Sequence, residues 1–513
     1  MKKLLRVIFG RTTMTIILML AQIGVVVYAY NVMKYDVNSI LGVLDVVALL
    51  MVVYIINRKN DNPSFKLAWL LLIIVFKLFG ALMYIFVRLQ LSTKIMAVRI
   101  GNLIEKTRGL LKQNHHVIEK LEKESRNITN FAQYMYGIAG GFPVYNNSTV
   151  KYFPLGEDKF EEMIKQLEKA EKFIFLEYFI IEEGIMWNTI LEILKRKVQE
   201  GVEVRLMYDG TCSIAHLPYN YTKRMEKLGI KCKMFNPIKP ILSTHQNNRD
   251  HRKILVIDGK VGFTGGVNLS DEYINKRVVY GHWKDNAIMV KGEAVKSFTA
   301  MFLQMWNVSE INDEEFDRYI DLDYSEFEGI KDGYIIPYGD SPMDGENVGE
   351  QVYIDILYHA HKYVHIMTPY LIIDNEMLMA LKYASKRGVD VKIIMPHIPD
   401  KEYAYAVART YYAELIEAGV EIYEYTPGFV HAKTFVSDDD TAVVGTINLD
   451  FRSLYLHFEC ATYMFKNSEI INIEKDYQAT LEKCQKIDIE NCRKQNILRK
   501  VTGRVLRLIA PLM

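Results

Sequence analysis

The sequence predicts an α/β protein made of two tandem α/β sandwich domains with mixed sheets, preceded by N-terminal transmembrane helices. Two observations predict the domains. A pattern of polar and small residues occurs twice, and a similar succession of apolar strands and amphipathic helices precedes each copy. A third observation, three apolar runs near the N-terminus, predicts the membrane helices. The chain of 513 residues is long enough for this arrangement.

A membrane anchor with two or three transmembrane helices is expected over residues 1–100. Its apolar runs are Thr13–Met33, Ile40–Ile56 and Leu67–Val87. The third run is long enough to cross a bilayer, but it contains Lys77, and the second run contains Asp45. Because a charge inside a bilayer is costly, the second run is expected to be re-entrant or packed against Lys77. The basic flanks leave two topologies open: the rest of the chain lies inside with two spans and outside with three.

Five segments are expected after the anchor. They are a helical connector over 101–140, a first α/β domain over 141–306, a solvated acidic linker over 307–333, a second α/β domain over 334–490, and a basic amphipathic helix over 491–513. Strand and helix patterns alternate in both domains. The two domains are most similar in the segments EGVEVRLMYDG from Glu200 and RGVDVKIIMPH from Arg387.

The repeated pattern reads HRKILVIDGKVGFTGGVN from His251 and HAKTFVSDDDTAVVGTIN from His431. Five residues keep identical offsets in the two copies: His251, Lys253, Asp258, Gly265 and Asn268, then His431, Lys433, Asp438, Gly445 and Asn448. The His and the Lys of each copy share one face of a strand. Each Asp follows at a turn. We therefore expect the two aspartates, although they belong to the catalytic motif, to hold loops and not to transfer protons.

Two copies that face each other would form a pocket for a phosphodiester. The lysines carry a fixed positive charge, and Lys253, Lys433, Asn268 and Asn448 would bind the phosphate oxygens. One His attacks phosphorus and the other protonates the leaving oxygen. We take His251 as the nucleophile, although the symmetry of the repeat leaves His431 open. No metal and no other cofactor is expected, because the lysines supply the charge that a metal would supply.

The composition excludes several other classes of protein. The formal net charge of +1 argues against a nucleic-acid-binding protein, which usually carries a basic excess. The five cysteines have no paired spacing, which indicates reduced thiols and not a disulfide framework or a zinc site.

The C-terminal tail is basic. Residues 493–513 contain six Lys or Arg and no acidic residue, and one helical face carries Ile497, Val501, Val505, Leu508 and Leu512. This pattern is typical of an amphipathic helix on an anionic membrane surface, and an ordinary helix packed on the second domain is the alternative.

The chain resembles the phospholipase D superfamily, whose signature is the HxKxxxxD motif in two copies. Within it, the bacterial cardiolipin synthases are the most similar family. The resemblance rests on three segments: NPSFKLAWLLLIIVFKLFGALMY from Asn62, GFPVYNNSTVKYFPLGEDKFEEMIKQLEKAEKFIFLEYFII from Gly141, and GTINLDFRS from Gly445. It implies two phospholipase-D-like domains in a multi-pass protein of the bacterial cell membrane, with a cytoplasmic catalytic part. It also implies that Asp285 and Glu459 orient the histidines.

The resemblance implies a cardiolipin synthase that transfers a phosphatidyl group from one phosphatidylglycerol to another through a phosphohistidine. Its partners would be phosphatidylglycerol and membrane lipid, with no nucleic acid and with the oligomeric state open. The lipid acceptor rests on the resemblance alone, so a phospholipase D hydrolase or a transferase with another alcohol acceptor are alternatives. A membrane-tethered nuclease is disfavoured by the balanced charge. A lipid-binding scaffold without activity is disfavoured because both motifs are complete.

Overall fold

The computed structural model describes residues 24, 27, 37–59, 61–89, 91–212, 216–237, 247–310 and 314–512. They form two compact units. The first comprises Met1–Ile95, Ile238–Asn247 and Val505–Met513, and the second comprises Met96–Pro237 and Asn248–Arg504. Apart from Gly24 and Val27, the predicted apolar run Thr13–Met33 lies outside the described residues.

The first unit contains the apolar helices α3 (Val37–Ile56), α4 (Pro63–Val75) and α5 (Lys77–Arg88). Asn62 caps α4 by accepting a hydrogen bond from the Ser64 N–H, and Pro63 occupies the first helical position. The run predicted as one span, Leu67–Val87, is broken at Phe76, whose φ of −123° and ψ of 65° are not helical. Lys77 begins α5 and forms an ion pair with Asp45 of α3, which is the pairing expected for the charges of these two apolar runs.

By length and composition, one helical stretch of the described residues could cross a membrane, Lys77–Arg108. The apolar helices Gly42–Ile56 and Pro63–Val75 are shorter. Nearly all of the first predicted run lies outside the described residues and the break at Phe76 divides the third, so the number of membrane spans stays a prediction.

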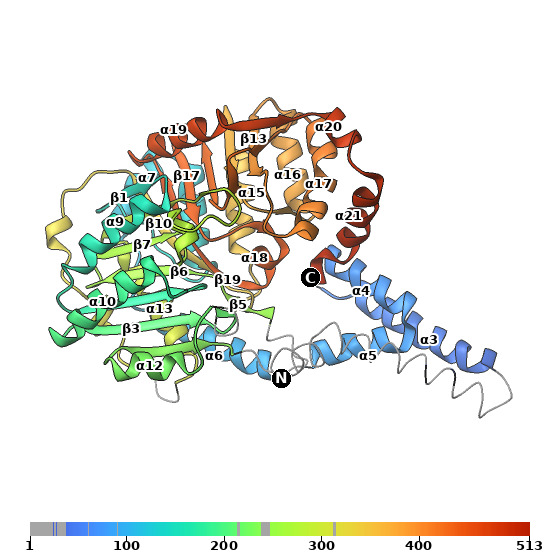
Figure 1. Cartoon of the computed structure of the whole chain (residues 1–513), viewed down its shortest axis with the longest axis horizontal. Coiled ribbons are helices and arrows are strands. Elements are labelled where there is room, and N and C mark those ends of the chain that lie inside the picture. The colour runs from blue at the N-terminus through green and yellow to red at the C-terminus, as the bar shows by residue number, and fades with distance from the viewer. Residues whose placement is uncertain are drawn as a thin grey trace. The chain divides into compact units, whose positions relative to one another are not determined.

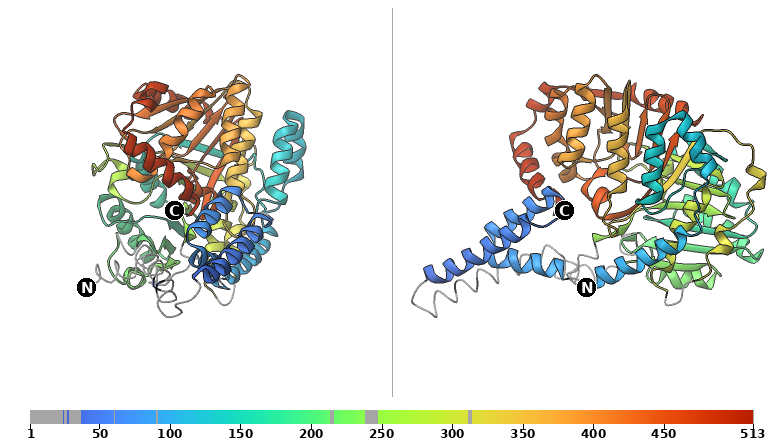
Figure 2. Two further views of the ribbon diagram at one scale, coloured as in Figure 1. Left: turned by 90° about the vertical axis from the view of Figure 1, so that its right-hand side faces the viewer. Right: turned by 180° about the vertical axis from the view of Figure 1, so that it is seen from behind.

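The connector is helical, as the sequence predicts. It consists of α6 (Leu91–Arg108), α7 (His115–Glu124) and α8 (Arg126–Gly137). Phe131 of α8 lies 4.5 Å from Tyr463 between ring centroids, and Glu124 accepts hydrogen bonds from Tyr334 and Lys466. The view from behind in Figure 2 shows α7 and α8 (cyan) alongside the strands. The end of the connector thus packs on the second half of the second unit.

The first half of the second unit is a mixed seven-stranded sheet of order β1-β9-β7-β6-β2-β3-β4. Its strands are β1 (Ser148–Phe153), β2 (Phe173–Tyr178), β3 (Glu203–Asp209), β4 (Lys231–Phe235), β6 (Lys253–Ile257), β7 (Val261–Gly265) and β9 (Ala287–Gly292). Strands β2, β3 and β4 are parallel, and the other neighbours are antiparallel. The helices of this half are α9 (Gly156–Leu167), α10 (Ile185–Gln199), α12 (Tyr221–Lys227), η2 (Asp271–Ile274) and α13 (Val295–Asn307).

The second half repeats this topology in a sheet of order β10-β19-β17-β16-β11-β13-β14-β20. Its strands are β10 (Tyr334–Asp340), β11 (Tyr363–Met367), β13 (Asp390–Pro396), β14 (Glu421–Tyr425), β16 (Thr434–Ser437), β17 (Thr441–Gly445), β19 (His457–Phe465) and β20 (Cys484–Ile487). Its helices are α15 (Val348–His359), α16 (Asn375–Lys386), α17 (Glu402–Glu417), α18 (Phe451–Tyr455) and α19 (Ile470–Leu481). The predicted duplicated α/β fold with mixed sheets is confirmed, and Figure 1 shows the first half in green and the second in orange to red.

Helix α13 lies between the two halves and is buried along nearly its whole length. Phe302 stacks on Phe175 of β2 with 4.6 Å between ring centroids. On the other side, a Cβ added to Gly339 of β10 would lie 3.0 Å from the Met301 sulfur. Because both sheets contact this one helix, the two halves share a core.

The prediction that the acidic linker is solvated is wrong for its described residues, 314–333. It contains α14 (Asp317–Ile320) and η3 (Ser325–Phe327), and Phe316, Tyr319 and Ile320 are buried. Tyr319 packs on Phe173 and Phe175 of the first sheet. Glu314 accepts two hydrogen bonds from Arg205 at 2.7 and 2.8 Å. The many acidic residues of this segment predicted exposure to solvent, although its aromatic residues Phe316 and Tyr319 are buried.

Two short parallel pairings exchange strands between the halves. Strand β5 (Arg249–Asp250) of the first half pairs with β19, and β15 (Gly428–Val430) of the second half pairs with β8 (His282–Lys284). A third pairing, within the second half, joins β12 (Leu371–Ile372) to β18 (Leu449–Asp450). Figure 1 shows the labels of β5 and β19 next to each other. These pairings bring the repeated motifs together.

The chain ends in α20 (Ile489–Arg493), α21 (Ile497–Ile509) and η4 (Ala510–Leu512). Helix α21 packs on α17 through Gly503, where an added Cβ would lie only 2.4 Å from the Ala406 carbonyl oxygen. The predicted apolar stripe points away from that contact: Ile497, Val501, Val505 and Leu508 are 75, 53, 56 and 57 % exposed. The tail is therefore an amphipathic helix that rests on the second half by one face and exposes its apolar stripe.

Candidate active site

The two motif histidines lie where the exchanged strands end. His251 follows β5, and its N–H donates to the Phe458 carbonyl of the other half at 2.9 Å. His431 follows β15, and its N–H donates to the Lys284 carbonyl of the other half at 2.7 Å. Each histidine backbone is thus fixed on the opposite half, by the residue that comes just before a predicted orienting acid.

The side chains repeat this crossed arrangement. The Nδ1 atom of His431 lies 2.6 Å from Asp285 of the first half. The Nδ1 atom of His251 lies 2.9 Å from both carboxylate oxygens of Glu459 of the second half. Both acids are fully buried. A carboxylate accepts the Nδ1 proton, which leaves each Nε2 available for chemistry. Neither motif histidine therefore has its orienting carboxylate in its own half.

The surroundings of both imidazoles favour the neutral form. Burial lowers the pKa of His251 well below its usual range, and the neighbouring Lys253 and Lys433 lower it further. Burial lowers the pKa of His431 to about 4, although its contact with Asp285 opposes the shift. A neutral imidazole is the form that acts as a nucleophile, and a bound phosphodiester anion would raise both pKa values.

The motif lysines lie beside the histidines and are fully buried. Lys253 donates to the His251 carbonyl oxygen at 2.6 Å, and Lys433 donates to the His431 carbonyl oxygen. Burial lowers the pKa of Lys253 to about 8 and that of Lys433 to about 7. Burial thus weakens the positive charge expected at these lysines, an effect that the sequence pattern does not show.

The motif aspartates bind backbone amides at the turns. Asp258 accepts hydrogen bonds from Glu171, Lys172 and Phe173 at 2.7–2.8 Å. Asp438 accepts the corresponding set, from His361, Lys362 and Tyr363 at 2.6–2.9 Å. Each aspartate therefore ties the turn after the motif strand to the start of the neighbouring strand. This is the loop-holding position expected from the sequence.

The two motif asparagines differ in their hydrogen bonds. Asn268 accepts from the Ile180 N–H at 3.1 Å and donates to the Tyr273 hydroxyl at 2.8 Å. Asn448 is 4 % exposed, and its buried Oδ1 has no hydrogen-bond partner in the described part of the chain. Asn268 is already held by protein groups, whereas the amide of Asn448 retains capacity for a ligand.

Sequence reasoning missed the residues that make the two histidines unequal. His251 is next to Phe179 and His457, with 4.9 and 5.4 Å between ring centroids. His431 is surrounded by aromatic rings at 5.4–5.9 Å, namely Tyr273, Trp283 and Phe429. Thr446 donates to Glu459. Two features of the sequence could have indicated this difference. Thr446 occupies the position that Gly266 has in the first copy of the repeat, and different residues flank the two acids.

One group of the described residues could hold a metal ion. The ligand atoms of His251, His457 and Glu459 all lie within 4.8 Å of one another, and all three residues are buried. The Nε2 of His457 accepts a hydrogen bond from Arg452 at 3.2 Å, which leaves its Nδ1 on the side of Glu459. Nδ1 of His251 already contacts Glu459. The position of these three residues is therefore also explained by the histidine–carboxylate pair, without a metal ion.

The family model described as "Cardiolipin synthase, PLD-like domain" matches residues 163–306 and 353–483, and "Phospholipase_D-nuclease N-terminal" matches residues 43–88. A cardiolipin synthase of Alkalihalophilus pseudofirmus is 32% identical over 480 residues, which cover 92% of this chain and 94% of the relative. One from Halalkalibacterium halodurans is 31% identical over 482 residues, with 92% and 94% covered. An uncharacterized protein of Streptococcus mutans is 52% identical over 462 residues, with 90% and 99% covered.

Among solved structures, a phosphatidylserine synthase of Haemophilus influenzae is similar with a TM-score of 0.53 and 14% sequence identity. The match covers 71% of this chain and 93% of that one. At this identity the likeness concerns the fold, and it agrees with the duplicated topology of the second unit.

Proposed function

Because the chain belongs to the cardiolipin synthase family of phospholipase-D-like enzymes, we propose that it makes cardiolipin and glycerol from two molecules of phosphatidylglycerol. The family makes it a phosphatidyltransferase that acts on phospholipids in association with a membrane. The observation that carries the proposal within the structure is the crossed arrangement of two histidine–carboxylate pairs. It supplies a nucleophile and a proton donor for one phosphodiester.

The first step forms a bond from His251 Nε2 to the phosphorus of the donor lipid and breaks the bond from phosphorus to the glycerol oxygen. His431 donates its Nε2 proton to that oxygen, and glycerol leaves. Burial lowers the pKa of both histidines, which favours the neutral, nucleophilic form at His251, while the contact with Asp285 opposes the shift at His431. The anionic substrate raises the pKa of His431, so that it carries a proton when the lipid is bound.

The second step reverses the roles. A hydroxyl of the second phosphatidylglycerol attacks the phosphohistidine, His431 takes the hydroxyl proton, and cardiolipin leaves His251 free. Lys253 and Lys433, which donate to the carbonyl oxygens of the two histidines, are close enough to these histidines to donate to the phosphate oxygens instead. A phosphate anion restores their positive charge, since it favours the ammonium form. Asn448 adds a hydrogen bond, while Asn268 holds the loop.

The N-terminal helices and α21 support membrane attachment of this enzyme. The ion pair between Asp45 and Lys77 neutralises two charges that would otherwise oppose burial in lipid. We propose that the first unit anchors the chain in the cell membrane by more than one pass. In this proposal the catalytic unit is cytoplasmic, and α21 places its exposed apolar stripe in the lipid interface.

Product analysis of the purified enzyme tests the proposed function. With phosphatidylglycerol as the single lipid, cardiolipin and glycerol should appear in equal amounts. Phosphatidic acid and glycerol would show instead that water is the acceptor, which is the hydrolase alternative. The variants His251→Ala and His431→Ala should each lose activity, because one shared site needs both histidines. Full activity of either variant would contradict the shared site.

A further inference from the structure

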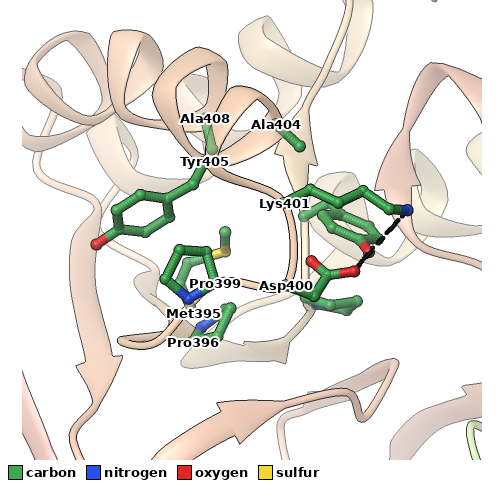
Figure 3. Close-up of a pocket in the computed structure, with 10 residues that line it drawn as sticks. Met395, Pro396, Pro399, Asp400, Lys401, Ala404, Tyr405 and Ala408 are labelled. Atoms are coloured by element: carbon green, nitrogen blue, oxygen red, sulfur yellow. Dashed lines mark hydrogen bonds and ion pairs between the residues drawn. The ribbon is translucent and has the colours of Figure 1, made fainter. Parts of the chain in front are cut away.

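A small pocket lies in the second half of the catalytic unit. It lies between the end of β13, the segment before β12 and the start of α17. Its polar groups are Tyr370, Asp400 and Lys401, and the rest of the lining is Pro369, Met395, Pro396, Pro399, Ala404, Tyr405 and Ala408. Figure 3 shows Asp400 and Lys401 on one side of this pocket and Tyr405 on the other.

The pocket is joined to the second motif by strand pairing. Leu371, which follows Tyr370, pairs with Leu449, which follows Asn448. The Thr368 hydroxyl donates to the Tyr370 carbonyl at 2.9 Å and accepts from the Leu449 N–H at 3.3 Å. The Ile398 N–H, three residues before Lys401, donates to the Gly428 carbonyl of β15, the strand that leads to His431. The pocket is therefore part of the framework that positions the site.

The charged groups of the pocket also act electrostatically on groups of the site. The low pKa of His251 has burial as its main cause, and Lys401 is one of the cations that lower it. The high pKa of Tyr273, which packs on His431, is caused mainly by burial, and Asp400 is one of the acids that raise it. The side chains at the mouth of the pocket thus act on both sides of the site.

Lys401 has capacity for an anion. Its ammonium lies 3.4 Å from the Tyr370 hydroxyl and 3.8 Å from the Asp400 carboxylate, and the side chain is 49% exposed. The Tyr370 hydroxyl donates to Asp400 at 2.6 Å, so the carboxylate is engaged by the phenol. By contrast, Arg252 forms ion pairs with Glu177 and Asp250. Among the described cations near His251, Lys401 is therefore suited to a ligand from solution.

The proposed reaction creates a need for such a group. A lipid acceptor brings a second phosphodiester, separated from its reacting hydroxyl by a short glycerol arm. The motif lysines bind the donor phosphate. Without a cation of its own, the acceptor phosphate would be repelled at close range by the negative charge of the donor phosphate. Water or free glycerol as acceptor carries no charge and creates no such need.

We propose that Lys401, held by Tyr370 and Asp400, binds the phosphodiester of the acceptor phosphatidylglycerol and so selects an anionic lipid over water or a neutral alcohol. Lys401 is in this role a specificity-determining residue. The inference rests on the proposed function and adds the recognition of the second substrate.

A partition experiment tests this role. Vesicles of phosphatidylglycerol are incubated with the enzyme and an excess of labelled glycerol. The phosphohistidine is then consumed by two competing acceptors, giving cardiolipin or labelled phosphatidylglycerol. Because both products arise from one intermediate, their ratio does not depend on the donor step. The variant Lys401→Gln should lower the ratio of cardiolipin to labelled phosphatidylglycerol by roughly tenfold, the size expected for one hydrogen bond to a charged group.

Two control variants sharpen the test. Lys401→Arg keeps the charge and should keep most of the wild-type ratio. Lys386→Gln removes an equal charge at the end of α16 and should leave the ratio unchanged, which separates a local contact from general attraction to an anionic vesicle. An unchanged ratio in Lys401→Gln, or an equal fall in Lys386→Gln, would overturn the inference. If the wild type releases phosphatidic acid without cardiolipin, the proposed function itself fails, and this outcome is distinct.

Discussion

At the residue scale, the feature that defines this site is the exchange of acids between the halves. His251 takes Glu459, and His431 takes Asp285, so that each pair spans both halves. The orienting acid fixes the Nδ1 tautomer and stabilises the imidazolium that forms during proton transfer. Loss of an acid therefore acts through its own histidine only.

If each acid supports the histidine of the other half, variants of the two acids should have effects opposite to those expected for pairing within one half. We use a phosphatidyl substrate with an activated leaving group, which does not need protonation by His431, so that His431→Ala retains a measurable rate. Adding Asp285→Asn to this variant should have no further effect, because the partner of Asp285 is already absent. Adding Glu459→Gln should lower the remaining rate by roughly a hundredfold, because Glu459 supports His251. The opposite pattern of rates would show that each acid serves the histidine of its own half.

The buried motif lysines predict a dependence of stability on pH. Lys433 has a pKa of about 7 in the folded chain, against an ordinary value of 10.5. Between these values the unfolded chain binds the proton more strongly, so the contribution of Lys433 to the free energy of unfolding rises with pH across this window. Below this pH window, Lys433 is protonated in both the folded and the unfolded chain, so its contribution to the free energy of unfolding no longer changes with pH.

The variant Lys433→Met should therefore be inactive but more stable than the wild type at pH 6, and its advantage should shrink by pH 9. Thermal unfolding of both proteins in one detergent at the two pH values measures this. The variant Lys382→Met is the control, because Lys382 lies on the surface and pairs with Glu414. An advantage of Lys433→Met that grows between pH 6 and pH 9 would contradict the direction of the shift.

At the residue scale, the sequence identified the histidines, lysines, asparagines and acids that the structure brings together. The motif residues could be identified because they recur at identical spacing in the two copies of the repeat. The sequence could not show which acid meets which histidine, since each acid follows the motif of its own half along the chain but contacts the histidine of the other half. It also missed the aromatic rings around His431, because aromatic residues in strands are usually core.

At the element scale, the sequence predicted the helices and strands of both halves from their apolar periodicity. It failed where composition hid the decisive residues. The run Leu67–Val87 is apolar except for Lys77, yet the helix breaks at Phe76, next to the lysine that pairs with Asp45 of another helix. In the acidic linker, single buried aromatics such as Tyr319 outweigh the charged residues around them.

Helix α21 gives a test at the same scale. Its stripe is exposed while Gly503 contacts α17, so the stripe is available to lipid. The variant Val501→Asp should weaken binding to anionic vesicles and lower activity on vesicles by several-fold, with little change in detergent micelles. Thr502→Asp adds the same charge beside the stripe and is the matched control. Equal loss of vesicle binding in the two variants would point to charge repulsion and not to insertion of the stripe.

At the scale of the whole molecule, the second unit is one catalytic body made from two copies of a fold. Helix α13 packs on both sheets, and the exchanged strands β5 and β15 lock the copies together. The duplication was readable from the sequence, because the repeat fixes the architecture. The exchange of strands was not, since β5 and β15 are each three residues long or shorter.

This architecture predicts that one chain contains one complete site. A mixture of full-length His251→Ala and His431→Ala proteins, refolded or expressed together, should remain inactive, because each chain lacks one histidine of its own site. Wild-type chains diluted with either variant should lose activity in proportion to their number. Recovery of activity in the mixture would show that the halves of different chains form the site together.

The central claim is that His251 carries the phosphatidyl group in a site to which both halves contribute. The most direct measurement is mass spectrometry of His431→Ala after brief reaction with a lipid that has an activated leaving group, quenched at alkaline pH to preserve a phosphohistidine. The account predicts a phosphatidyl adduct on the peptide that contains His251, and its loss in the double variant with Glu459→Gln. An adduct on any other residue, or turnover without an adduct, would contradict it.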